Sequence, residues 1–218
     1  MISPRADGGG LPLPPSALYR TLCAWLRGPV ARLFSLSVEG LEHLPTQTPY
    51  IIAANHHNYL DGVILALTVP QPIAFMVMPR VYRATRLHPL FHDRIGSIPL
   101  TLERGDVGAL RRALGVLREG RVVGIFPEGP FSVHGRLERG LPGVALLALR
   151  SGVPVVPAGI RGTYEALAGR RCYIPRRHPL RVRFGSPRRF TAEPHPRRLT
   201  RAKVTQRIMQ DIAGLLGD

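Results

Sequence analysis

Residues 51–62 read Ile-Ile-Ala-Ala-Asn-His-His-Asn-Tyr-Leu-Asp-Gly and join a short apolar run to the start of a helix. The first four residues are all apolar, which is typical of a buried strand. Asn58 is a residue type that caps helices, and apolar residues follow it at helical spacing. The segment therefore predicts a strand that passes through a tight turn into a helix, the repeating unit of an α/β fold.

The same alternation continues along the rest of the chain. Short runs rich in Val and Ile alternate with longer segments of helical period, which predicts an α/β domain with a mostly parallel sheet flanked by helices. The predicted strands are residues 33–38, 50–53, 73–77, 97–101, 122–126, 154–158 and 180–184. The predicted helices are residues 59–69, 81–91, 107–119, 143–151 and part of 192–216.

Length and composition restrict the class of protein. The 218 residues are 44% hydrophobic, so one domain can bury a sizeable core and wholesale disorder is excluded. No run reaches the roughly 18 apolar residues of a transmembrane helix. Cys23 and Cys172 lie far apart in the sequence, which argues against a disulfide framework and favours a reducing cytosol. Residues 1–15 are rich in Gly and Pro, lack the order of a signal peptide, and are expected to be flexible.

The charge is the first indication of function. Thirty Lys and Arg residues against 14 Asp and Glu residues give a net charge of +16. Such a field favours nucleic acid, an anionic membrane surface or phosphorylated substrates, and charge alone does not choose among them. Against a nucleic-acid-binding module, the sequence has no recognisable nucleic-acid motif, and its 6% aromatic content supplies few platforms for base stacking.

Residues 16–34 have the pattern of an amphipathic helix, which Ser16 caps and Gly28-Pro29 interrupts. Its two faces differ, with Leu18, Leu22, Trp25 and Leu26 on one face and Arg20 and Arg27 elsewhere. Two interpretations stay open. The helix packs on its own domain, or it lies in a membrane interface, where Trp and Leu enter the bilayer and the arginines meet lipid phosphates.

A histidine and a carboxylate flank the turn between the first strand and helix. His56 follows the apolar run, and Asp61 lies in the first turn of the helix, where the helix dipole favours a carboxylate. The two side chains can meet across that turn, so Asp61 can hold one ring nitrogen of a base that takes a proton from an alcohol. His88 and Asp93 have the same spacing, but no strand leads into them, and we interpret that pair as part of a loop.

Two further strand ends carry candidate residues. Residues 124–129 read Gly-Ile-Phe-Pro-Glu-Gly, in which Pro127 ends a buried strand and Gly129 permits a close or left-handed backbone approach. Glu128 is either an acceptor that stabilises this turn or a carboxylate of the site. Arg104 follows the strand expected at 97–101, where its guanidinium can clamp a phosphate or lie solvated on the surface.

Four segments, in this order, resemble the glycerolipid acyltransferase family, typified by the 1-acylglycerol-3-phosphate O-acyltransferases. They are Asn55-His56 with Asp61, residues 96–104, residues 126–129, and residues 153–157, which read Val-Pro-Val-Val-Pro. The resemblance covers about residues 38–163, which is more than half of the chain. It implies an α/β acyltransferase domain, here residues 35–218, preceded by a membrane-associating helical segment at 16–34.

The resemblance also implies direct acyl transfer from a thioester, acyl-CoA or acyl carrier protein, to the hydroxyl of a lysophospholipid such as 1-acylglycerol 3-phosphate. The implied general base is His56, and Asp61 orients it. The implied substrate-binding residues are Asn55, Arg104 on the acceptor phosphate, and the turn of Phe126, Pro127, Glu128 and Gly129. No metal or cofactor is expected. The resemblance places such a protein peripherally on the cytoplasmic side of the cell membrane, at an anionic surface.

The sequence departs from the family pattern in three places. Phe131 stands where the family commonly has an acceptor-binding arginine, and Arg136 or Arg139 is a candidate to replace its charge. Two extra residues precede Arg104, and Asn58 stands where a small hydroxyl residue is common. The first two departures leave the acceptor head group open. Phe131 also leaves open a catalytically inactive membrane-surface protein that uses the same fold, although the intact His56 and Asp61 argue against it.

Overall fold

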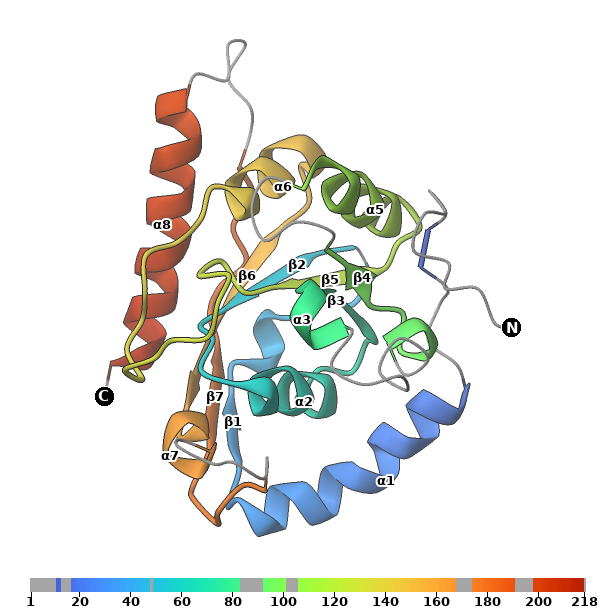
Figure 1. The fold of residues 1–218 in the computed structure, drawn as a ribbon, viewed down its shortest axis with the longest axis vertical. Coiled ribbons are helices and arrows are strands. Elements are labelled where there is room, and N and C mark those ends of the chain that lie inside the picture. The colour runs from blue at the N-terminus through green and yellow to red at the C-terminus, as the bar shows by residue number, and fades with distance from the viewer. Residues whose placement is uncertain are drawn as a thin grey trace.

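The computed structural model describes residues 11–12, 17–47, 49–82, 92–100, 106–167, 174–190 and 198–217. These residues form seven strands in one sheet, flanked by helices on both faces (Figure 1). The strands are β1 Ser37–Glu39, β2 Ile51–Ala54, β3 Ile73–Val77, β4 Ile98–Pro99, β5 Val122–Ile125, β6 Val155–Arg161 and β7 Arg181–Phe184. The helices are α1 Ala17–Leu33, α2 Tyr59–Thr68, α3 Pro79–Tyr82, α5 Val107–Arg118, α6 Gly143–Ser151, α7 Thr163–Leu167 and α8 Arg198–Leu216, with a 3₁₀ turn at Leu41–His43.

The sheet has the order β1-β7-β6-β2-β5-β3-β4, and only β6 and β7 pair antiparallel. This confirms the mostly parallel α/β fold. In a parallel sheet the carboxyl ends of neighbouring strands meet at one edge, where α/β proteins commonly bind ligands. The ends of β2, β5 and β6 therefore lie side by side, although they are far apart in the sequence.

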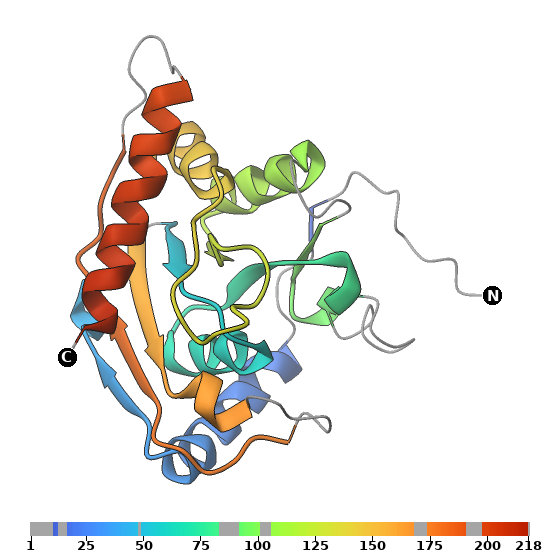
Figure 2. The same ribbon diagram turned by 60° about the vertical axis from the view of Figure 1, so that its left-hand side comes forward.

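The apolar run of β2 is explained by burial on both faces. Ile52 and Ala54 pack in a cluster with residues of α2, while Ile51 and Ala53 pack on the opposite side with α5, α6 and α8. All four side chains are fully buried. Because successive strand residues point to opposite faces, a strand covered by helices on both sides needs an apolar residue at every position. Figure 2 shows α8 lying along β6 on the second of these faces.

Two predictions near the N-terminus were wrong. Helix α1 continues through Pro29 to Leu33, so Gly28-Pro29 does not interrupt it. The strand predicted at 33–38 is shorter, because Ser35 takes a left-handed conformation (φ 44°) and β1 begins only at Ser37. The predicted helix at 81–91 falls largely outside the described residues, as does most of the expected flexible segment 1–15.

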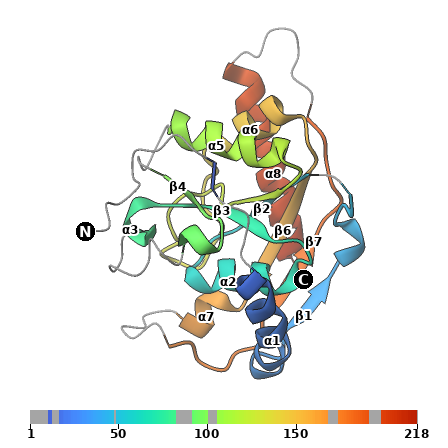
Figure 3. The same cartoon turned by 90° about the vertical axis from the view of Figure 1, so that its right-hand side faces the viewer.

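One side of α1 packs on the domain and the other faces outward. Arg27 donates from Nε to the carbonyl of Leu67 at the end of α2 (2.6 Å), and Val30 packs against the core. Figure 3 shows α1 passing α2. Leu22, Leu26 and Trp25 are exposed, Trp25 to 77%. In the described part of the chain, no helix is both long and apolar enough to cross a membrane.

Candidate active site

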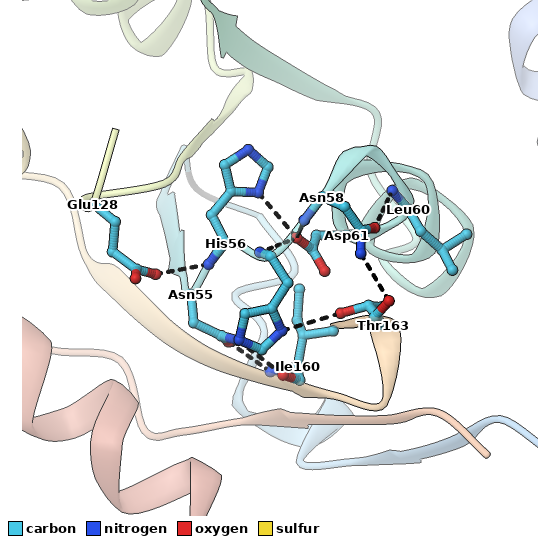
Figure 4. A network of polar contacts seen from close by, with 9 residues as sticks. Asn55, His56, Asn58, Leu60, Asp61, Glu128, Ile160 and Thr163 are labelled. Atoms are coloured by element: carbon cyan, nitrogen blue, oxygen red, sulfur yellow. Dashed lines mark hydrogen bonds and ion pairs between the residues drawn. The ribbon is translucent and has the colours of Figure 1, made fainter. Parts of the chain in front are cut away.

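The loop that leaves β2 is fixed to β6 by Asn55. The side-chain amide of Asn55 donates to the carbonyl of Ile160 (2.8 Å), and its oxygen accepts from the amide of the same residue (2.7 Å). Asn55 is fully buried, so its side chain continues the pairing of the two strands beyond their backbone ladder. We therefore assign to Asn55 a positioning role at the start of the loop (Figure 4).

Asp61 organises the turn that follows. Its Oδ2 accepts hydrogen bonds from the backbone amides of His57 (2.6 Å) and Asn58 (2.8 Å), while the Asn58 side chain caps α2 by accepting from the amide of Leu60 (2.9 Å). This reciprocal capping box satisfies amides that the helix itself cannot. The carboxylate of Asp61 is fully buried, so the turn is held by a charge that water does not screen.

The same carboxylate oxygen holds the imidazole of His56. Nδ1 of His56 lies 3.0 Å from Oδ2 of Asp61, so Nδ1 carries the proton and Nε2 is left as the proton acceptor. The His56 side chain is 12% exposed, whereas that of Asp61 is completely covered. The contact expected from the sequence between these two residues is therefore present, and its geometry is that of a base with a buried orienting carboxylate.

Glu128 connects the turn after β5 to the histidine loop. Its Oε1 accepts from the backbone amide of His56 (2.7 Å) and its Oε2 accepts from the amide of Glu138 (2.6 Å). Burial raises the pKa of Glu128 to about 7, although the two amide bonds oppose this, and the charges of Glu138 and Asp61 add to it. Both carboxylate oxygens thus accept hydrogen bonds from backbone amides, so Glu128 links the His56 loop to the segment that contains Glu138.

His57 faces away from His56 and contacts α7. Its Nδ1 lies 3.3 Å from Oγ1 of Thr163, and the side-chain amide of Asn58 donates to the Thr163 carbonyl (2.7 Å). Burial lowers the pKa of His57, and the nearby charge of Asp61 opposes that effect only in part. Helix α7 was not predicted from the sequence, yet it supplies the fully buried Thr163, which contacts the side chains of His57 and Asn58 in the loop.

Four of the other predicted residues lie in the segment from 127 to 139. Pro127 is buried two residues after the end of β5, and Gly129 has φ 81°, which is the left-handed one of the two conformations that the sequence allowed. Arg136 and Arg139 are exposed. Arg139 lines an open pocket of about 700 Å³ together with Glu128, Phe131 and His134. Arg104 lies outside the described residues, and its role stays a prediction.

The rings around His56 include residues that the sequence did not single out for contact. Phe126 stacks on the imidazole with ring centroids 3.7 Å apart, and Phe131 makes a T-shaped contact with the imidazole at a centroid distance of 4.5 Å. Phe131 in turn meets Tyr59 edge-on at 4.7 Å. Within the described ranges, no three His, Cys, Asp or Glu side chains gather where they could hold a metal ion. The site therefore offers a base and apolar walls.

Comparison with known proteins identifies the family. The model of the family described as Acyltransferase matches residues 35–161, which is more than half of the chain. The chain belongs to this acyltransferase family. The matched range includes β2, β5 and β6, and with them the whole His56 loop.

Individual relatives share part of the sequence. The chain is 30% identical to the chloroplastic 1-acyl-sn-glycerol-3-phosphate acyltransferase BAT2 of Brassica napus, over 64% of this chain and 41% of that protein. It is 26% identical to the 1-acyl-sn-glycerol-3-phosphate acyltransferase of Bacillus subtilis, over 58% of this chain and 63% of that one. The match thus spans only about two fifths of the Brassica protein's length.

A solved structure shares the fold of this acyltransferase. The crystal structure of the 1-acyl-sn-glycerophosphate acyltransferase PlsC from Thermotoga maritima superposes with a TM-score of 0.67. The superposition covers 92% of this chain and 82% of that chain, at 21% sequence identity. The likeness extends beyond the residues that the family model matches and supports the arrangement of the whole sheet.

Proposed function

We propose that this protein transfers a fatty acyl group from a thioester to the hydroxyl of a lysophospholipid, 1-acylglycerol 3-phosphate, in phospholipid synthesis. The observation that carries the proposal is the contact of His56 Nδ1 with the buried Asp61 carboxylate, which leaves Nε2 to accept a proton. Family membership and the activity for which the relatives are named point to the same reaction.

The reaction needs one base and no covalent intermediate. Nε2 of His56 takes the proton of the acceptor hydroxyl as its oxygen attacks the thioester carbonyl carbon. The C–S bond then breaks, and the leaving thiolate takes the proton from the imidazolium, which returns His56 to its starting state. Asp61 stabilises the imidazolium through the contact at Nδ1. A positioned base of this kind accelerates a reaction by about 10²–10⁴-fold, and the rest comes from holding both substrates together.

The acceptor is bound, in this proposal, on the side of the site formed by residues 126–139. Arg139 lines the pocket beside Phe131 and can offer a guanidinium to an acceptor phosphate, with exposed Arg136 nearby in the sequence and Arg104 as a further candidate. Phe131 contributes an apolar wall beside His56, which suits the glycerol and hydrocarbon part of a lipid. Acyl-CoA or acyl carrier protein serves as the donor, and no cofactor takes part.

We also propose peripheral attachment to an anionic membrane surface on the cytoplasmic side. The outward face of α1 presents Leu22, Trp25 and Leu26, while Arg20 and Arg32 are exposed on the same helix. Each arginine near an anionic surface contributes about 1 kcal/mol of attraction. Trp25→Ala is expected to reduce co-sedimentation with anionic vesicles. Equal binding of the wild-type protein to neutral and anionic vesicles at low salt would contradict an electrostatic contribution of the arginines to membrane attachment.

The function is tested by incubating the purified protein with labelled acyl-CoA, or acyl carrier protein loaded with the same chain, and a panel of lysolipids. Mass spectrometry of the products identifies the acceptor and the acylated position. The expected product is diacylglycerol 3-phosphate from 1-acylglycerol 3-phosphate, and its formation must be lost in His56→Ala. Failure of every donor and acceptor pair, with folded protein and added membrane, would refute the proposal and favour the inactive scaffold.

A further inference from the structure

Three aromatic rings form a parallel column that ends at His56. Phe75 lies in β3, Phe126 follows β5, and His56 follows β2, so the column crosses three neighbouring strands of the sheet. Phe75 and Phe126 are parallel to within 4°, with centroids 5.9 Å apart. Phe126 and His56 are parallel to within 7°, with centroids only 3.7 Å apart. The imidazole therefore lies almost directly over the face of Phe126.

This geometry suits a charged imidazole better than a neutral one. Two neutral aromatic rings prefer an offset or edge-to-face arrangement, because the negative faces of their π systems repel each other. A cation over the face of a ring is attracted by the same negative charge, and the attraction grows where water is excluded. His56 is only 12% exposed, so the stack favours the imidazolium that exists after His56 has taken a proton.

Asp61 alone does not fix the ring. Its single contact at Nδ1 leaves the imidazole free to swing about that hydrogen bond, out of line with an approaching hydroxyl. The Phe126 face restricts the plane of the ring, and the T-shaped contact with Phe131 restricts it further. Nε2 is thus held in one direction, which is the condition for efficient proton transfer.

We propose that Phe126 is a positioning residue for the proton transfer, which fixes the plane of the His56 imidazole and stabilises its imidazolium form. The inference rests on the proposed acyl transfer and assigns to Phe126 a role through His56, distinct from direct contact with the acceptor. An interaction that is stronger in the transition state than in the ground state changes kcat and leaves substrate binding nearly unchanged.

The test compares three variants of the full chain. Phe126→Leu removes the π face and is expected to lower kcat by roughly 5- to 30-fold, with the acceptor KM changed less than about 2-fold. Phe126→Tyr retains the face and is expected to keep kcat within about 3-fold of wild type. Phe75→Leu removes a ring from the same column without touching His56 and serves as the packing control. Circular dichroism and urea unfolding are used to check that each variant is folded.

Two results would overturn the inference. Equal losses of kcat in Phe126→Leu and Phe75→Leu would show that Phe126 contributes only to packing. A raised acceptor KM at unchanged kcat in Phe126→Leu would show that Phe126 instead contacts the acceptor. A second measurement does not depend on activity. The ring protons of His56 lie over Phe126, so their NMR signals are shifted upfield, and this shift is expected to be lost in Phe126→Leu but kept in Phe126→Tyr. If the wild-type protein shows this upfield shift but transfers no acyl group to any acceptor, the proposed function is refuted, whereas the stacking of His56 on Phe126 is not.

Discussion

The double role of Asp61 can be separated by two substitutions. Asp61→Asn keeps one oxygen at the position of Oδ2, where it still accepts from the amides of His57 and Asn58, and places its nitrogen where Oδ1 now lies. Oδ1 has no hydrogen-bond partner among the described residues, so no bond in this part of the chain is broken there. Asp61→Ala instead removes the whole group and takes the acceptor from both amides, of which that of Asn58 is buried and that of His57 partly buried.

The expected magnitudes follow from these contacts. An amide that loses its acceptor inside the protein costs about 1–3 kcal/mol, so the loss of two such bonds in Asp61→Ala should lower the free energy of unfolding by about 2–6 kcal/mol. Asp61→Asn should lower it less, by about 1–3 kcal/mol, because the capping bonds remain and only the new side-chain nitrogen lacks an acceptor among the described residues. Its effect on catalysis is larger. At 3.0 Å and an effective dielectric constant of about 20, a carboxylate attracts an imidazolium by about 5 kcal/mol, and losing half of that slows transfer roughly 10²-fold.

Urea unfolding followed by circular dichroism measures the stability, and release of thiol from acyl-CoA in the presence of lysophospholipid measures kcat. Asp61→Asn should be folded and slow, with the acceptor KM near that of the wild-type protein. A folded Asp61→Asn protein with kcat within about 3-fold of wild type would refute the role of its charge. Equal stability of the two variants would refute the capping argument.

Three further outcomes are expected. His56→Ala should lower kcat by at least about 10²-fold, whereas His88→Ala, whose pair has the same spacing but no preceding strand, should stay within a few-fold in the same assay. Because burial raises the folded pKa of Glu128 from 4.5 to about 7, the free energy of unfolding of the wild-type protein should fall as pH rises through that interval. Urea titrations at several pH values should show a smaller fall for Glu128→Gln, and an equal fall in both proteins would contradict this prediction. Gly129→Ala should lower the free energy of unfolding by about 1–2 kcal/mol, since φ is 81° and a Cβ would lie 2.8 Å from a leucine side chain. Gly143→Ala is the control, because a Cβ there meets open space, and it should not lower the free energy of unfolding.

The sequence predicts well those elements that depend on local pattern. Strand β3 and helix α6 have the predicted bounds, because turn signals or a change of period mark both ends. The prediction for α1 was wrong because Pro29 lies on the exposed side of the helix, where the carbonyl that loses its amide partner can be solvated. Strand β6 continues past the predicted end at 158, because β7 supplies an antiparallel partner that no local pattern reveals.

The candidate site divides in the same way. The contact between His56 and Asp61 spans five residues across one helical turn, so spacing and capping chemistry are enough to predict it. Glu128 reaches the His56 amide across 72 residues, and Asn55 reaches Ile160 across 105. Contacts of this kind depend on the strand order, which local patterns do not determine. Phe131 could be recognised only as a departure from the family, and its T-shaped contact with the imidazole is a property of the folded chain.

The strand order also determines when, during synthesis, the histidine loop can form. Among the described strands, β2 pairs only with β5 and β6, and β5 enters the sheet between β2 and β3. At about 5–20 residues per second, the ribosome needs roughly 3–14 s after β2 to complete β5, and longer to reach Ile160. During that interval β2 has two unpaired apolar edges, which are exposed to aggregation. The nascent chain therefore contains His56 well before the strands that position its loop have been made, so the site forms only after the C-terminal half of the chain emerges.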